Sequence, residues 1–479
     1  MSESTLSHSE IVHIKVNDAQ MRENLKTAMH TLQTNRLNLI ENKYHDWQGL
    51  RDKARGIKNR ALSSLHDRVV EFEKNATRNG IKVHFASSDT DACQIIYQIM
   101  MENNVDRILK GKSMASEEIG LNHFLEKKGL LATESDLGEL ILQLNNEPPV
   151  HIVVPAIHRN RYEVGQIFHD KLNAPLESDI EKLNGIARNH LRSQFKTLKM
   201  GLSGANFGIS KEGAIWLIEN EGNGRMCTTA PDIHVAIMGI EKIVETFDDA
   251  ATLVHLLTPS ATGQFIPTYN NIITSPRKNG DKDGPKQVHI VIFDHNRSSM
   301  LTHDDFYEAL RCIRCGACMN FCPVYDKIGG HSYRTTYPGP IGEVISPNLF
   351  GIDKTGDVLS FCSQCGRCSE VCPVKIPLAN LIRRLRSYKV GQGAQHITGQ
   401  ENIKISKGQN FSFKIYKKIA TNGSLWRSSL SKAYTFKFIV DNFGESLPVL
   451  KNWAQYKKLP SINGVFDKRV QEIEGVSYE

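Results

Sequence analysis

The sequence has no apolar stretch long enough to cross a membrane as a helix, which takes about 18 or more residues. Its richest apolar runs, His151–Ala156 and Val288–Phe293, are only strand-sized. The N-terminus also lacks a basic segment followed by an apolar one, and this argues against a signal peptide. We therefore expect a cytoplasmic protein with no transmembrane segment, and peripheral association with the inner face of the membrane stays open.

Scattered cysteine pairs, which would indicate a disulfide scaffold, are also missing. Eight of the ten cysteines fall in two short clusters, and only Cys93 and Cys227 lie outside them. Close clusters in a chain of 479 residues indicate metal binding instead. The remaining composition, 40% hydrophobic and 23% charged, is ordinary for a globular protein.

Net positive charge is confined to the C-terminal part of the chain. From Pro377 onward there are 17 Lys and Arg against 7 Asp and Glu, whereas the preceding part has 42 against 45. We find no zinc-finger or RNA-binding motif, so no nucleic-acid partner is expected. The basic tail could steer an acidic protein partner into place, or it could simply be a solvated helical face.

Hydrophobic periodicity divides the chain into four regions. Residues 1–76 are predicted to be helical, and residues 77–300 alternate between strand and helix patterns, which favours an α/β domain with a largely parallel sheet. Residues 301–390 hold the cysteine runs, which lie between predicted helices that begin near Thr302 and Pro377. Residues 391–479 are predicted to form a basic, mainly helical tail, with Trp426 and Trp453 as candidate anchors. The predicted strands are Ile81–Ala86, Val150–Ala156, Ala214–Ile218, His234–Ile237 and Val288–Phe293.

The two cysteine runs have the same form, Cys-x2-Cys-x2-Cys-x3-Cys-Pro, and they lie 50 residues apart. The first consists of Cys312, Cys315, Cys318 and Cys322, and the second of Cys362, Cys365, Cys368 and Cys372. Three thiolates at this spacing wrap a tight turn around one face of a [4Fe–4S] cubane, and a glycine in each run allows the close approach. Structural zinc is the alternative, but it takes two separated Cys-x2-Cys pairs rather than three thiolates in series.

The fourth cysteine of each run is expected to bind the other cluster, as in two-cluster ferredoxins. This predicts one cluster on Cys312, Cys315, Cys318 and Cys372, and a second on Cys362, Cys365, Cys368 and Cys322. Crosswise ligation would hold the clusters close enough to exchange single electrons. We therefore predict an electron-transfer protein with two [4Fe–4S] clusters, although clusters with a purely structural role are the plainer alternative.

The middle domain contains polar, glycine-rich segments but neither a Walker A sequence nor Gly-x-Gly-x-x-Gly. Their simplest interpretation is a β-hairpin, with a strand near Phe207–Ser210, a second strand at Ala214–Ile218 and a further turn at Glu221–Gly224. A second interpretation is a ligand site, for which the candidates are Glu219, Asn220, Asn223, Arg225 and Thr228. The spacing identifies no ligand and no catalytic residue. The middle domain also contains a group of basic side chains, His158, Arg159 and Arg161, which fits a solvated helix start better than a substrate site.

The segments GANFG at Gly204–Gly208 and ENEGNGR at Glu219–Arg225, followed by the two cysteine runs, resemble the lactate utilization protein B family. The resemblance covers nearly the whole chain, and all eight expected ligand cysteines are present. It implies that residues 77–300 are a lactate-utilization domain similar to the ribose-5-phosphate isomerase and CoA-transferase fold. It also implies an α-helical ferredoxin module in which the loop from Pro323 to Phe361 packs as helix.

The same resemblance implies a role in oxidising L-lactate to pyruvate, in which this chain is an electron-relaying subunit that is not catalytic by itself. Its partners would be a cysteine-rich subunit like those of heterodisulfide reductase and a smaller lactate-utilization-domain protein. Three alternatives stay open: an equivalent subunit for another 2-hydroxy acid such as glycolate, a CoA-transferase-like enzyme using Glu219 or Glu221, and a cluster-bearing regulator that binds nucleic acid through its tail.

Overall fold

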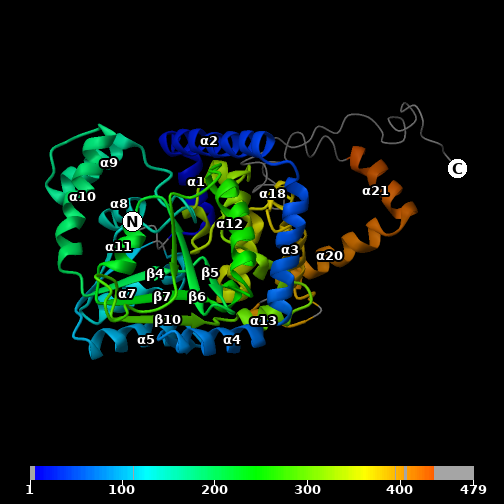
Figure 1. The fold of residues 1–479 in the computed structure, drawn as a ribbon. Helices are drawn as coiled ribbons and strands as arrows, with labels where there is room; N and C mark the ends of the chain where they lie inside the picture. The colour runs from blue at the N-terminus through cyan, green and yellow to red at the C-terminus, as the bar shows by residue number, and fades with distance from the viewer. Residues whose placement is uncertain (1–5, 112, 394, 404–406, 436–479) are drawn as a thin grey trace. The chain divides into compact units, whose positions relative to one another are not determined.

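The computed structural model describes residues 6–435 apart from residues 112, 394 and 404–406 (Figure 1). It separates into two compact units, Met1–Ile403 and Lys404–Glu479. The first unit contains the α/β domain, the cysteine runs and the N-terminal helices. Within the described residues, no helix is both long and apolar enough to span a bilayer.

A six-stranded parallel sheet forms the centre of the α/β domain, with β10, β7 and β4 side by side (Figure 1). Its strand order is β1-β10-β7-β4-β2-β3. Side chains alternate between its faces, so that Val291 and Phe293 join the core beneath helix α5, whereas Ile290 and Ile292 join the core beneath helix α4. The strands are β1 (Lys82–Ala86), β2 (Arg107–Gly111), β3 (Leu131–Glu134), β4 (Met200–Gly204), β7 (Ile233–Gly239) and β10 (Gln287–Phe293); the helices are α4 (Leu65–Arg78) and α5 (Asp89–Glu102).

The predicted strand at Val150–Ala156 is wrong, because this segment forms turns instead. The His151 Nδ1 accepts hydrogen bonds from the backbone N–H groups of Val153 and Val154, at 3.1 Å each. Pro155 has no N–H to donate to a sheet. A local side-chain acceptor and a missing donor therefore outweigh the apolar, β-branched composition of the segment.

A second, four-stranded sheet has the order β8-β5-β6-β9 and contains the predicted hairpin. The turn expected at Glu221–Gly224 is wrong beyond Gly222, since helix α11 (Asn223–Thr229) begins there. Gly222 takes a φ of +85°, and the Glu219 carboxylate accepts the N–H groups of Gly224 and Arg225. The strands are β5 (Phe207–Ile209), β6 (Ala214–Glu219), β8 (Ile243–Val244) and β9 (Tyr269–Ile273).

Long helices form the N-terminal region, as the periodicity predicts. Helix α2 (Ala19–Lys43) buries Met21, Leu25 and Met29 and crosses helix α12 (Phe247–Thr262) (Figure 1). The rest of the predicted helical region is divided at Ser64 into α3 (Trp47–Ser63) and α4. These helices pack on both the α/β domain and the cysteine-containing module.

Short helices surround the cysteine runs, and the loop between the runs is largely helical. The expected helix start at Thr302 is wrong, because Thr302 ends helix α13 (Arg297–Leu301), and a 3₁₀ turn at Tyr307–Arg311 leads into Cys312. After the second run, Pro377 precedes helix α19 (Leu378–Lys389), as predicted, and this helix buries one apolar stripe. The other helices of this module include α14 (Ala317–Asn320), α16 (Gly339–Phe350) and α18 (Arg367–Val371), and the buried stripe of α19 consists of Leu378, Leu381, Ile382 and Leu385.

The second unit contains α20 (Lys407–Ala420) and α21 (Gly423–Thr435) among its described residues. Trp426 lies on α21 with 39% of its surface exposed, and Trp453 lies outside the described residues. Residues just before this unit belong to the first one: Ile397 is buried, and the Ile352 N–H donates to the Thr398 carbonyl. The compact unit therefore extends to Ile403, beyond the boundary predicted at residue 390.

Candidate functional site

Four cysteine side chains line one small cavity between the two cysteine runs. Cys312, Cys315 and Cys318 come from the first run and Cys372 from the end of the second. The rest of the wall is apolar and includes Ile152, Ile341 and Ile376. The structure thus brings together the four residues predicted to bind the first cluster.

The other four cysteines, Cys322, Cys362, Cys365 and Cys368, form a second group. Burial raises the pKa of the Cys368 thiol to about 12, and the charges of Cys362, Cys322 and Cys365 act in the same direction. Burial likewise raises the pKa of Cys322 to about 11, with Cys365 among the groups that contribute. The charge of Cys322 thus interacts with those of cysteines in the opposite run, which is compatible with crosswise ligation.

The backbone around each run is shaped to surround thiolates. Arg314 and Gly316 have φ values of +61° and +74°, and Gln364 and Gly366 repeat this pair with +60° and +80°. These left-handed residues turn backbone N–H groups toward sulfur: Arg314 donates to Cys312 Sγ and Gln364 to Cys362 Sγ, each at 3.4 Å. Four soft thiol donors around each of two positions, supported by N–H···S bonds, fit an iron–sulfur cluster.

Two arginines from the N-terminal helices hold the end of the second run. Arg36 on α2 donates to the Val371 carbonyl at 2.6 Å, and Arg51 on α3 donates to the Cys372 carbonyl at 2.7 and 3.1 Å. Both side chains are buried, at 3% and 7% exposure. Sequence reasoning missed them, because more than 300 residues separate each arginine from its acceptor. Their positive charges lie beside a site that becomes anionic when thiolates bind a metal.

A buried ion network joins the α/β domain to the first cysteine run. Arg297 donates to both oxygens of Glu118, at 2.8 and 2.7 Å, and to Glu241 at 2.6 Å. Arg314, which lies between Cys312 and Cys315 in the chain, contacts Glu241 at 3.3 Å and stacks on Tyr337. The Tyr337 hydroxyl donates to Glu118 at 2.6 Å. The network fixes the position of the first run relative to the parallel sheet.

A larger cavity of about 490 Å³ lies next to the first cysteine group and shares Ile152 and Arg314 with its wall. The α/β domain contributes most of the lining, through the ends of β4 and β6, the start of α8 (Leu137–Leu144) and one face of α12. The cysteine-containing module contributes Arg314 and Tyr337. Lys242 also lines the cavity, and its Nζ donates to the Ala205 carbonyl at 2.6 Å.

Only part of the ligand set predicted in the middle domain reaches this cavity. Glu219 and Asn220 line it, whereas Asn223, Arg225 and Thr228 lie on α11 and are not part of the lining. Glu219 is buried, and it accepts hydrogen bonds from the N–H groups of Gly224 and Arg225 and from the Asn271 amide. Its carboxylate therefore caps α11 and ties β6 to β9. This gives it a structural role and does not favour a free nucleophile of the CoA-transferase type.

His158 and Arg159 do not form a substrate site with Arg161, which is exposed. The His158 Nε2 and the Arg159 guanidinium both contact Glu147, and Arg159 also pairs with Glu163 at 2.7 Å. His331 brings a third possible ligand atom within 4.8 Å of Glu147 and His158. The Arg159 contact already compensates the Glu147 charge, so the cluster is explained as an ion network.

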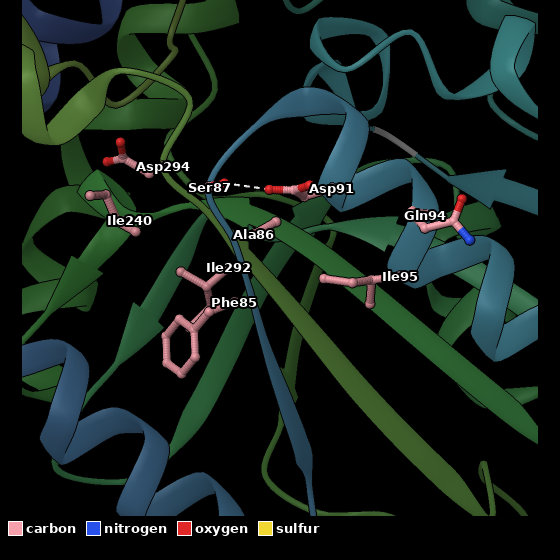
Figure 2. Close-up of a pocket in the computed structure, with 9 residues that line it drawn as sticks. All are labelled: Phe85, Ala86, Ser87, Asp91, Gln94, Ile95, Ile240, Ile292 and Asp294. Carbon is pink, nitrogen blue, oxygen red and sulfur yellow. Dashed lines mark hydrogen bonds between the residues drawn. The ribbon is translucent and has the colours of Figure 1, made fainter.

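A shallow hollow lies at the carboxyl ends of β1 and β10 (Figure 2). Its lining includes Phe85 and Ile292 from the two strands, and Asp91 faces Ser87 with a hydrogen bond between them (Figure 2). Asp294 accepts from the N–H and hydroxyl of Ser298. Both acids thus have local partners, and none of the eight clustered cysteines lines this hollow.

Three family models match successive parts of the chain. They are described as LUD domain over residues 69–293, 4Fe-4S dicluster domain over residues 308–376, and lactate utilisation protein B, C-terminal, over residues 384–473. The dicluster match includes all eight cysteines of the two runs.

Named relatives are similar over almost their whole length. An uncharacterized electron transport protein YkgF of Escherichia coli is 37% identical, covering 94% of this chain and 93% of its own. Lactate utilization protein B of Bacillus subtilis is 36% identical over 96% and 95%, and that of Bacillus cytotoxicus is 35% identical over 93% and 92%. A crystal structure of a duf162 family protein from Deinococcus radiodurans aligns over 49% of this chain at 13% identity, but its TM-score of 0.27 carries no argument.

Proposed function

Since the chain belongs to the lactate utilization protein B family and is an iron–sulfur protein of lactate utilization, we propose that it relays electrons during oxidation of L-lactate to pyruvate. That oxidation releases two electrons and two protons. Two [4Fe–4S] clusters, each exchanging one electron, would accept the pair one electron at a time. The observation that carries the proposal is the gathering of eight cysteines into two groups of four within one compact unit.

We assign Cys312, Cys315, Cys318 and Cys372 to the first cluster. Its neighbour would be held by Cys362, Cys365, Cys368 and Cys322. This crosswise assignment is supported by the cysteines that line the first cavity and by the interaction of the Cys322 charge with that of Cys365. The N–H···S bonds and the buried Arg36 and Arg51 would offset the negative charge of the thiolates.

The family resemblance also supplies the proposed partners. These are a cysteine-rich subunit like those of heterodisulfide reductase and a smaller lactate-utilization-domain protein, with which this chain would form an oxidising complex. The same resemblance is the ground for proposing a ribose-5-phosphate isomerase or CoA-transferase type of fold for residues 77–300, and the parallel sheet is compatible with it.

The test combines metal analysis with growth. Anaerobically purified protein should contain about eight iron atoms and eight acid-labile sulfides per chain, the content of two [4Fe–4S] clusters. A deletion strain should lose growth on L-lactate and keep growth on pyruvate. Complementation with Cys312→Ala should fail, whereas Cys93→Ala is the matched control, because Cys93 is buried but lies outside both groups. Stoichiometric zinc without sulfide, or normal growth of the deletion strain where no other lactate dehydrogenase exists, would contradict the proposal.

A further inference from the structure

The two cysteine runs have the same spacing but opposite surroundings. In the first run, Ile313 and Asn320 are buried, at 6% and 2% exposure. Ser363 and Glu370 occupy the same positions of the second run, and both are exposed. The outer side of the first run is therefore covered by protein, whereas the outer side of the second run is open.

The cover over the first run comes from the turn that contains His151. A Cβ placed on Gly316 would lie 3.1 Å from the His151 ring and 3.5 Å from Val153. The His151 Nε2 also donates to the Asn320 side chain at 2.9 Å, in a buried position. A Cβ placed on Gly366, the matching glycine of the second run, would meet no atom of the described residues within 4 Å. The α/β domain thus shields one run and leaves its repeat uncovered.

The same difference holds for the cysteines themselves. Cys315 is 7% exposed, whereas Cys365, at the same position of the second run, is exposed. Gln364 is exposed as well, and its backbone N–H and its amide donate to Cys362 Sγ at 3.4 and 3.3 Å. The open loop is therefore shaped around its sulfur atoms by bonds within the run, and a group held by Cys365 lies at the surface of the first unit.

An open loop of this kind suits the exchange of single electrons with another protein. Electron transfer requires two redox centres to come close, and it forms or breaks no bond. Encounters between redox proteins are transient and use small interfaces, under about 1,200 Å². A short polar loop that presents Ser363 and Gln364 can supply such a contact without an exposed apolar patch, which would favour a permanent interface.

We propose that the second cysteine run is the point at which this chain exchanges electrons with a separate one-electron carrier protein, which contacts residues 363–367. The first run exchanges electrons with the outside only through the second. In each exchange one electron passes between the carrier's centre and the cluster of the second run, so one centre is oxidised as the other is reduced, and no proton or bond changes. The inference rests on the proposed function for the two clusters, and it adds the order in which electrons pass them.

The first experiment measures how accessible each cluster is in the anaerobic, dithionite-reduced full chain. Paramagnetic resonance is recorded with and without a soluble gadolinium chelate. The two signals are assigned with Cys312→Ala, which should lack the first cluster, and Cys362→Ala, which should lack the second. The chelate should speed the relaxation of the second signal strongly and that of the first only slightly, because dipolar relaxation falls steeply with distance.

The second experiment measures electron delivery to a protein. Cytochrome c, a one-electron haem carrier, is mixed rapidly with the reduced chain, and its reduction is followed by absorbance. Ser363→Trp should slow this reaction by about tenfold or more, within the one to three decades over which association rates vary among variants of one interface. The matched control is Ser193→Trp on α10 (Ile180–Lys196), because Ser193 is also exposed but lies in the α/β domain. Iron and sulfide content shows whether each variant keeps its clusters.

The outcomes separate this inference from the proposed function. Equal relaxation of both signals overturns it, and so does relaxation of neither, which would mean that another part of the chain or a second copy covers the loop. It is also overturned if Ser363→Trp, with full iron content, reduces cytochrome c as fast as Ser193→Trp does. If Ser363→Trp loses iron, the chelate experiment on the unaltered chain decides. A wild-type chain without eight iron atoms and sulfides would instead contradict the proposed function.

Discussion

Replacing Arg297 by methionine tests the ion network that connects the sheet to the first cysteine run. The Arg297 side chain is 2% exposed, and its partners Glu118 and Glu241 are 0% and 2% exposed. The substitution keeps an apolar side chain of similar length but leaves two buried carboxylates without their cation. Breaking a buried pair by removing one partner costs about 3–5 kcal/mol. We therefore expect a loss of that size in the free energy of unfolding.

The loss converts into a shift of the unfolding midpoint. At about 2.1 cal/mol/K per residue, a unit of roughly 400 residues unfolds with an entropy near 0.8 kcal/mol/K, so Arg297→Met should lower Tm by about 4–6 °C. The assay is thermal unfolding at one scan rate, with Arg60→Met as the control. Arg60 is 62% exposed and forms one surface pair with Asp249, whose loss should cost less than about 1 kcal/mol.

The stability difference between wild type and Arg297→Met should also depend on pH. Burial would raise the pKa of Glu118, but the Arg297 charge and hydrogen bonds from His295, Arg297 and Tyr337 bring that pKa well below its ordinary value. A depressed pKa contributes stability that is complete above the unfolded value of about 4.3 and lost as the pH falls. Without Arg297, burial dominates and the carboxyl group becomes easier to protonate. The difference between wild type and variant should thus widen as the pH rises from about 4 toward neutrality.

A compensating variant that removes the two buried carboxylate charges provides a second test of the network. Adding Glu118→Gln and Glu241→Gln to Arg297→Met removes the stranded charges, so part of the lost stability should return. If Arg297→Met melts like Arg60→Met, or if the triple variant is no more stable than the single one, the network does not carry the assigned energy.

Two further outcomes are expected. Crosswise ligation predicts that Cys372→Ala damages the same paramagnetic signal as Cys312→Ala; a match to Cys362→Ala would reverse the assignment. Truncation after Ile403 should leave iron and sulfide content unchanged but slow association with the partner subunits at low salt, and equal rates for both chains would exclude a docking role for the basic tail.

The sequence by itself determined the elements whose signals are local. The two cysteine runs are recognisable because spacing within eleven residues decides which thiols can share a cluster. Apolar strand runs such as Val288–Phe293 and the helix that begins near Pro377 were predicted for the same reason, since each signal lies within a few residues. Val150–Ala156 was mispredicted because the His151 ring supplies a turn-forming acceptor that composition does not reveal.

Tertiary structure alone decided which distant charges meet. Arg36 and Arg51 reach the second cysteine run across more than 300 residues, and Arg297 joins Glu118 across 179. The cavity beside the first cysteine run exists only because α12, the ends of β4 and β6 and that run come together in the fold. Such contacts depend on how helices and sheets pack, and no periodicity along the chain encodes that arrangement.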